Sequence, residues 1–170
     1  MRHMSLVRRA EPADAPEVLR LRQVMIDSLG GPGDVSPEDT AGSDRSADWH
    51  GESLPGLRVR LGEPDGDFAA FVVDHPERPG ALAALVAGTI EYRIGRSANP
   101  RGTVGFVFSV ATDPEARRRG YARACMGELL EWFRSRGAAQ VQLTASAQAR
   151  PLYDSLGFRP KPDPLLELKL

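Results

Sequence analysis

The clearest hydrophobic pattern in the chain is an apolar stripe in its last third. Its members recur at steps of three and four, the spacing that places side chains on one face of a helix. They are Ala122, Cys125, Met126, Leu129, Leu130 and Phe133. Gly137 follows them, as glycine does at many helix ends. The pattern predicts an amphipathic helix that packs on a sheet, with Cys125 in the core rather than exposed as a nucleophile.

Strand-like segments lie on both sides of this helix. Thr103–Thr112 predicts one strand, and Val141 and Leu143, which alternate with polar residues, predict another. A strand, a helix and a second strand in this order form a crossover, so we expect the two strands to run parallel. Two earlier strands are predicted over Phe68–Val73 and Ala81–Ile94, and a tight turn over 99–102.

Further helices are predicted towards both ends of the chain. A first helix runs from Glu11 to just before Gly30, with Asp14 as its N-cap. Residues 34–66 are rich in Gly, Pro, Ser and Asp and predict at most a second, short helix. A last short helix runs from about Gln148 to Gly157, and extended chain follows. We therefore expect a single α/β domain over residues 1–170, built on a mixed sheet.

The composition is that of a folded protein without a strong net charge. Hydrophobic residues make up 41% of the 170 residues, charged residues make up 26%, and the net charge is −1. Such a chain has no positive field to draw it to nucleic acid or to anionic lipid, so neither is expected as a partner. No apolar stretch approaches the roughly 20 residues of a membrane span, and no signal-peptide core follows Met1.

Cysteine and lysine usage indicates the cellular setting. A single cysteine cannot form an internal disulfide, and no paired Cys/His spacing suggests a metal site, so a reducing, cytoplasmic location without a bound metal is expected. Only Lys161 and Lys169 among the 22 basic residues are lysines, a usage typical of a GC-rich bacterial genome. The presence of both Met1 and Met4 indicates that Met4 is the natural start and that residues 1–3 were added.

Basic residues gather where the strand Thr103–Thr112 meets the long helix. A helix start leaves about four backbone N–H groups without partners and carries roughly half a positive charge, so it holds phosphate well. Gly120 lets the backbone approach a bulky anion closely, and Ala122 keeps the first turn slim. The arginines add charge and forked donors; they are Arg117, Arg118, Arg119 and Arg123. This joint predicts a site for a pyrophosphate or a sugar phosphate.

Two motifs on these elements resemble those of the GNAT superfamily of acyl-CoA-dependent N-acetyltransferases. One is Arg-x-x-Gly-x-Ala at 117–122, after a strand and an Asp-Pro-Glu turn, and the other is Tyr153 followed by Leu-Gly-Phe at 156–158. The resemblance is firm over 68–158. It implies a central, mostly antiparallel sheet with one parallel crossover pair, flanked by about four helices. It also implies acetyl-CoA as cosubstrate and a primary amine, on a small molecule or a peptide, as acceptor. Homodimers are common in the family.

The resemblance also implies roles for the phosphate joint and the strand before it. The backbone from Arg117 to Ala122, including Arg118, Arg119, Gly120 and Tyr121, would hold the pyrophosphate of CoA, with Arg123 nearby. The backbone of Val110, Ala111 and Thr112 would pair with the pantetheine arm as an added strand does. One N–H near Val110 would meet the thioester carbonyl.

Catalysis requires a neutral amine and a proton for the leaving thiolate. Tyr153 is the candidate general acid, because it lies about 100° round the short helix from the apolar Leu152. Many family members carry a base, a glutamate, on the strand before the phosphate turn, and this chain has none there. Glu91 is the nearest substitute, and Asp48 and His50 are alternatives. His3 and His75 are expected at the surface.

The charge of the segment 27–67 suggests an acceptor class. It holds ten acidic and three basic residues, and in this family the segment after the first helix commonly walls the acceptor site, so we expect a cationic amine. Two other functions stay open. The chain could be an acetyl-CoA-binding sensor module without turnover, which the missing strand glutamate favours. A nucleic-acid-binding domain is disfavoured by the net charge.

Overall fold

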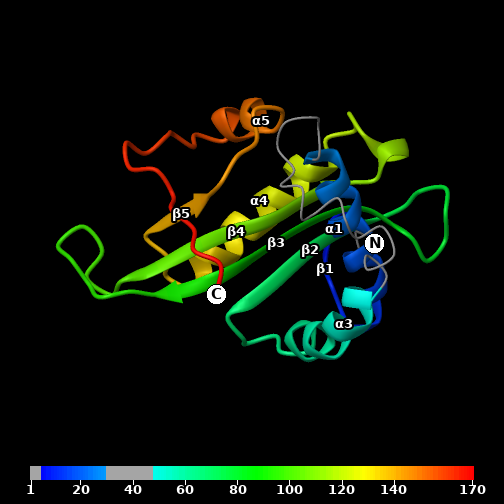
Figure 1. Ribbon diagram of the computed structural model, residues 1–170, viewed down its shortest axis with the longest axis horizontal. Helices are drawn as coiled ribbons and strands as arrows, with labels where there is room; N and C mark the ends of the chain where they lie inside the picture. The colour runs from blue at the N-terminus through cyan, green and yellow to red at the C-terminus, as the bar shows by residue number, and fades with distance from the viewer. Residues whose placement is uncertain (1–4, 30–47) are drawn as a thin grey trace.

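The computed structural model describes residues 5–29 and 48–170, which form a five-stranded sheet with helices on both faces (Figure 1). The strands lie in chain order across the sheet, and neighbours are antiparallel except for the last pair, which is parallel. They are β1 (Arg8–Arg9), β2 (Phe68–Asp74), β3 (Leu82–Tyr92), β4 (Thr103–Thr112) and β5 (Gln140–Leu143). The mixed sheet with one parallel crossover pair is confirmed.

Four α-helices and two 3₁₀ turns complete the part of the chain that the structure describes. Helix α1 packs on β3 and β4 in front of the sheet in Figure 1, α3 packs against α1 and β2, and α4 lies behind the sheet on β2 and β3. The bounds are η1 (Pro12–Asp14), α1 (Ala15–Leu29), α3 (Asp48–Leu61), η2 (Pro114–Ala116), α4 (Tyr121–Ser135) and α5 (Arg150–Ser155).

The two faces of the sheet have separate hydrophobic cores. Cys125, Met126, Leu129 and Phe133 of α4 are fully buried on one face, so the predicted stripe is confirmed. The Phe133 ring lies so close to β4 that a Cβ built on Gly105 would be 2.7 Å from its Cδ1 atom. The glycine therefore sets how closely α4 packs on the sheet.

The parallel pair is short, and β4 continues beyond it. Residues Val104–Val107 pair with Gln140–Leu143, after which β5 diverges from β4 (Figure 1). The ladder with β3 shifts at the same level, because Ala87 faces Ser109 while Gly88 faces Val107. From residue 108 to 112, β4 has no strand partner on its β5 side within the described residues. This open edge points towards the N-terminus of α4.

Several elements differ from the predictions. Helix α3 has 14 residues and tolerates Pro55, which the Gly- and Pro-rich sequence did not suggest. Strand β1 was not predicted, since two arginines carry no strand pattern. Asp14 is not the N-cap: Glu11 caps η1, and the Asp14 carboxylate accepts the Glu11 amide (2.7 Å) in a capping box and is also bound by Arg8.

No helix among the described residues is long and apolar enough to span a bilayer.

Candidate active site

The turn between β4 and α4 is anchored by Asp113. Its N–H donates to the Ala83 carbonyl of β3 (2.8 Å), and its carboxylate accepts the Glu115 amide (3.0 Å). Its own carbonyl accepts the Ala116 amide (2.9 Å), which closes the 3₁₀ turn η2. Pro114 fits the first position of that turn, where no N–H is needed. The Asp-Pro-Glu sequence therefore forms a rigid start to the phosphate joint.

Two arginines from distant segments fix Asp113 in place. Its side chain is only 3% exposed and accepts hydrogen bonds from Arg20 of α1 (2.9 Å) and from Arg78 of the β2–β3 turn. Burial by itself raises the pKa of Asp113, but the Glu115 amide and the two arginines outweigh it and lower the pKa below its ordinary value. The carboxylate therefore ties α1, β2–β3 and the joint together.

The joint presents a run of unpartnered amides. Within the described residues, the N–H groups of 117 to 120 donate to no backbone carbonyl, and the first intrahelical bond of α4 is from the Ala124 amide to the Gly120 carbonyl (3.0 Å). Gly120 has φ +75° and Arg118 has φ +62°, both left-handed. Successive turns of this kind form concave nests of N–H groups that suit an anion. The predicted phosphate joint thus has the geometry of an anion cradle.

The arginines of the joint surround this cradle. Arg117, Arg118, Arg119 and Arg123 are all exposed. Arg119 lies 3.6 Å from the Glu77 carboxylate, and Arg123 donates to the Ser155 hydroxyl of α5 (2.5 Å). Arg117 and Arg118 form no hydrogen bond or ion pair with the residues that the structure describes. Two guanidinium groups are thus available for an anion.

The open edge of β4 presents only part of the predicted pantetheine site. Because Asp113 donates to β3, the alternation of an antiparallel ladder directs the polar groups of Ala111 to β3 as well. The N–H and C=O groups of Val110 and Thr112 then face away from β3, towards the opening. Val110 and Thr112 can therefore pair with an extended ligand, whereas Ala111 contributes packing.

Tyr153 of α5 belongs to the hydrophobic cluster on the α4 side of the sheet, against which Val110 of the open edge also packs. The tyrosine is 5% exposed and packs edge-on against Phe158, with ring centroids 5.9 Å apart. Burial raises the pKa of its phenol. The hydroxyl forms no hydrogen bond within the described part of the chain, and the residue lines a cavity of about 480 Å³. The phenol is therefore protonated at neutral pH and has its donor available.

The structure separates Glu91 from Val110, although its ion-pair partner Arg93 lines the same cavity as Tyr153. Glu91 faces Val104 across the ladder, six residues from Val110, which is about 20 Å along the strand. Its carboxylate is paired with Arg93 (2.8 Å) and is 41% exposed. His50 and Asp48 belong to α3, which packs against α1 and β2, on the side of the sheet away from β5.

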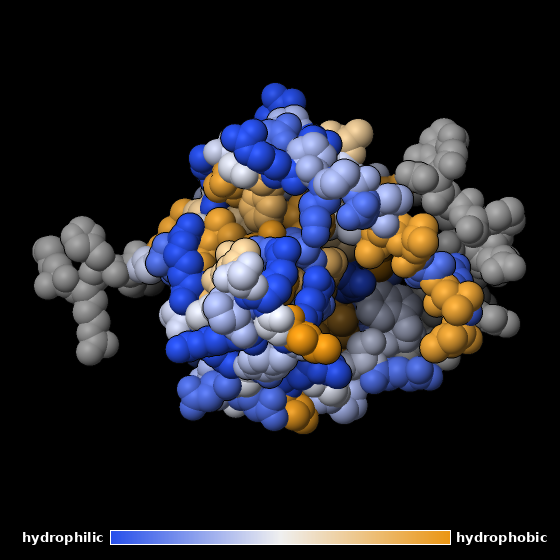
Figure 2. All heavy atoms as spheres, turned by 90° about the vertical axis from the view of Figure 1, so that its left-hand side faces the viewer, coloured by the Kyte–Doolittle hydropathy of each residue, from blue (hydrophilic) through white to orange (hydrophobic). Residues whose placement is uncertain are grey.

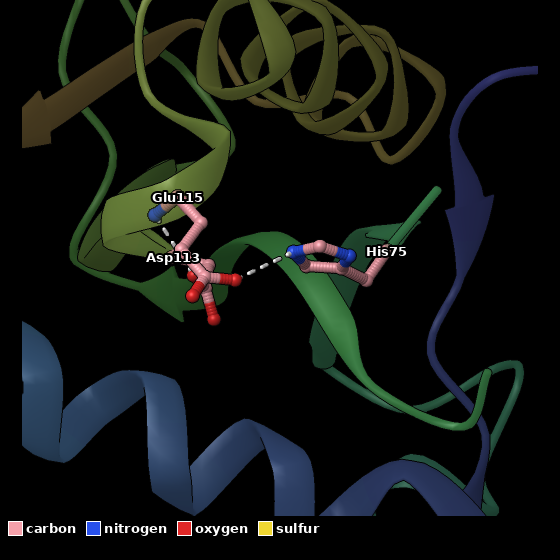
Figure 3. Close-up of side chains that lie close together, drawn as sticks. All are labelled: His75, Asp113 and Glu115. Carbon is pink, nitrogen blue, oxygen red and sulfur yellow. Dashed lines mark hydrogen bonds and ion pairs between the residues drawn. The ribbon is translucent and has the colours of Figure 1, made fainter. Parts of the chain in front are cut away.

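His75 is buried, so its expected place at the surface is wrong (Figure 3). Its side chain is 1% exposed, and its Nδ1 accepts the amides of Glu77 (3.2 Å) and Arg78 (3.1 Å). The sequence showed only a Pro-containing turn after β2. The turn in fact folds back over the imidazole, because the ring supplies the acceptor that its two amides need.

His75, Asp113 and Glu115 form a cluster whose possible ligand atoms lie within 4.8 Å of one another (Figure 3). Because Nδ1 accepts two N–H bonds, the proton of the neutral ring is on Nε2, which faces the Glu115 carboxylate at 3.8 Å. A protonated Nε2 offers no lone pair to a cation, and Asp113 already serves two arginines. The donor set therefore suits a structural role and not a metal.

Two features near the site were missed from the sequence. Arg22 of α1 donates to the Ser109 hydroxyl (2.6 Å), which is buried beside the irregularity in β4. Arg20 and Arg78 bind Asp113 across 93 and 35 residues. The helical spacing of α1 does place Arg20 beside Glu17, but no local pattern predicts contacts with β4.

Solved structures share this architecture. A GCN5-related N-acetyltransferase from Ralstonia eutropha JMP134 superposes with a TM-score of 0.73 at 23% identity, covering 95% of this chain and 97% of that chain. A predicted acetyltransferase from Clostridium acetobutylicum, crystallised with acetyl-CoA, has a TM-score of 0.71 at 19% identity, covering 96% and 94%. The fold is that of the N-acetyltransferases.

Sequence comparison identifies the family. The model of the acetyltransferase (GNAT) family matches residues 36–158, and the chain belongs to this family. A mycothiol acetyltransferase of Thermobispora bispora is 36% identical over 109 residues, which are 62% of this chain and 35% of that protein. A glucosamine 6-phosphate N-acetyltransferase of Trypanosoma brucei brucei is 39% identical over 56 residues, 33% and 38% respectively. The chain thus spans little more than a third of the length of the curated relatives that it matches.

Proposed function

We propose that this protein transfers the acetyl group of acetyl-CoA to a primary amine of a small molecule or peptide. The observation that carries the proposal is the run of unpartnered amides at 117–120, beside the open edge of β4. The relatives' names refer to mycothiol and to a sugar phosphate, so family membership leaves the acceptor open.

The residues present fit acetyl-CoA. The amides from Arg117 to Ala122 would bind the diphosphate, aided by the α4 dipole and the exposed arginines. The pantetheine amides would pair with Val110 and Thr112 at the open edge, as an added strand does. The N–H of Val110 would donate to the thioester carbonyl; such a donor is typically worth about 3–4 kcal/mol in the transition state.

The reaction then needs two proton movements. The neutral amine attacks the thioester carbon, a C–N bond forms, and the C–S bond breaks to leave a thiolate. Tyr153 would give its proton to that sulfur, for which its raised pKa keeps the phenol protonated. Because Glu91 lies about 20 Å from Val110 along the sheet, we route the amine proton to water rather than directly to that carboxylate.

The test is CoA-thiol release with a panel of primary amines, using Tyr153→Phe and the matched control Tyr92→Phe. Tyr92 is 65% exposed and does not line the cavity, so its variant should keep wild-type turnover. We expect Tyr153→Phe to lower kcat by about 10²–10⁴-fold while calorimetry shows an unchanged Kd for acetyl-CoA. Saturable binding of acetyl-CoA without turnover of any amine would instead favour the sensor module.

The proposed setting is the cytoplasm of a bacterium. The lone cysteine, Cys125, is buried in the core, as is usual for a protein of a reducing compartment. Fractionation of the natural host with an antibody to the protein would test this.

A further inference from the structure

The cavity beside Tyr153 lies at the β5 edge of the sheet and is lined from both faces, because Tyr153, Val141 and Leu143 belong to the core on the α4 side. Gly105 faces Phe133 of α4, so the next residue, Phe106, faces the other way, together with its β5 neighbour Gln142. Phe106 and Gln142 form part of the floor of the cavity, and the chain after α5, residues 158–165, forms a wall. Its volume of about 480 Å³ suits a small molecule.

Basic side chains dominate the charged lining of this cavity. Arg93, Arg150, Arg159 and Lys161 line it, against the acidic Asp154 and Asp163. Figure 2 shows the end of the molecule on the left of Figure 1, towards which β5 and the chain after α5 lie, and hydrophilic side chains crowd it around smaller hydrophobic patches. The whole chain has a net charge of −1, so the excess of positive charge in this cavity does not follow from the overall composition.

Two of the four cations are neutralised within the fold and two are not. Arg150 is paired with Asp154 (2.9 Å), and Arg93 is paired with Glu91 (2.8 Å). Arg159 and Lys161 form no hydrogen bond or ion pair with any residue in the ranges 5–29 and 48–170. They lie on the wall after α5, in the same cavity as the Tyr153 phenol.

We propose that this cavity binds the acceptor amine and that the acceptor carries an anionic group held by Arg159 and Lys161. The inference rests on the proposed acetyl transfer. An amine whose nitrogen lies near Tyr153 would extend its anionic group, a phosphate or a carboxylate, along the wall to the two cations. A guanidinium fork and an ammonium both bind such oxygens by charge-assisted hydrogen bonds.

This assignment reverses the acceptor class that the acidic segment 27–67 suggested. Residues 30–47 of that segment, with four of its ten acidic residues, lie outside the described residues. None of its described acidic residues lines the cavity. Arg159 and Lys161, the two lining cations without a partner among the described residues, favour an acceptor with an anionic group.

The experiment compares amines that differ only in the anionic group. Glucosamine 6-phosphate is paired with glucosamine, and glycine with glycinamide, and kcat/KM is measured for each with saturating acetyl-CoA. We expect the anionic member of at least one pair to be preferred by about tenfold or more, and added salt to reduce the preference. The pair that shows it identifies phosphate or carboxylate as the group recognised.

In the double variant Arg159→Gln/Lys161→Gln, the ratio of kcat/KM for the anionic amine to kcat/KM for its neutral partner should fall close to one. The matched control Arg101→Gln/Lys169→Gln changes an arginine and a lysine that do not line the cavity, and should keep the preference. Turnover without any preference, or a preference that survives the double variant, would overturn the inference and leave acetyl transfer intact. If no amine is acetylated, binding is measured by calorimetry instead. Saturable binding of glucosamine 6-phosphate or glycine supports the cavity assignment if the double variant abolishes it. Absence of binding to the wild type refutes the assignment.

Discussion

At the scale of single residues, Cys125 shows how burial removes reactivity. The thiol lies on the inner face of α4 and is fully buried, and burial raises its pKa to about 12. At pH 8 only about one thiol in 10⁴ is therefore ionised, and the thiolate is the reactive form. We expect no reaction with an aromatic disulfide reagent in the native protein and one thiol per chain in denaturant, measured by absorbance. Rapid labelling of the native protein would show that α4 opens readily.

His75 is a second residue whose environment decides its role. Substitution His75→Phe keeps the ring but removes the acceptor of the Glu77 and Arg78 amides, so we expect a loss of about 1–2 kcal/mol in the free energy of unfolding. Because the protonated Nε2 cannot bind a cation, neither Zn²⁺ nor a chelator should change the Tm of the wild type. A Zn²⁺-dependent rise in Tm that is absent from His75→Phe would contradict this tautomer.

At the scale of elements, the packing of α4 on β4 depends on Gly105. A Cβ there would lie 2.7 Å from the Phe133 ring, and α4 would have to move. We expect Gly105→Ala to destabilise the protein by about 1–3 kcal/mol in urea unfolding, as overpacking does. Gly127 lies on the exposed side of α4 with nothing within 4 Å, so Gly127→Ala should stabilise by about 0.5–1 kcal/mol. If Gly105→Ala and Gly127→Ala changed the free energy of unfolding equally, this would contradict the close packing of α4 on Gly105.

At the scale of the whole molecule, three carboxylates that are bound by arginines and amides give the fold its acid sensitivity, and two of them, Glu17 and Asp113, join distant segments. Burial opposes the ionisation of Asp14, Glu17 and Asp113, yet hydrogen bonds from arginines and amides lower each pKa below its ordinary value. A carboxyl whose pKa is lower in the folded chain than in the unfolded chain stabilises the fold at every pH above its unfolded-chain pKa, near 4. This stabilisation is lost as the pH falls through the folded-chain pKa. We expect unfolding free energies that are level from about pH 5 to 7 and decline below pH 4.

Asp113→Asn isolates one of these carboxylates. It removes the charge that Arg20 and Arg78 share, so we expect a loss of about 2 kcal/mol at pH 7. The difference from the wild type should shrink as pH falls towards 3, because the wild-type carboxyl becomes neutral too. A difference that stays constant with pH would show that packing, and not charge, explains the loss.

The sequence by itself determined most of the elements and their order, with the exception of β1 and the full length of α3. The stripe from Ala122 to Phe133, the alternation around Val141 and the glycines at 120, 137 and 157 are local patterns with a period or a backbone conformation of their own. A crossover of this kind leaves few arrangements, so the parallel pair and the position of the phosphate joint followed from the same patterns. The family motifs lie within these elements, which is why they could be read directly.

Tertiary structure alone decided which side chains meet. The binding of Asp113 by Arg20 and Arg78, the burial of His75 and the basic cavity beside Tyr153 all join segments that are distant in the chain. The same holds for the separation of Glu91 from Val110, which depends on the register of β3 and β4. Local periodicity fixes which face a residue occupies, but it contains no information on register or on what packs against that face, because these depend on the summed contacts of the folded chain.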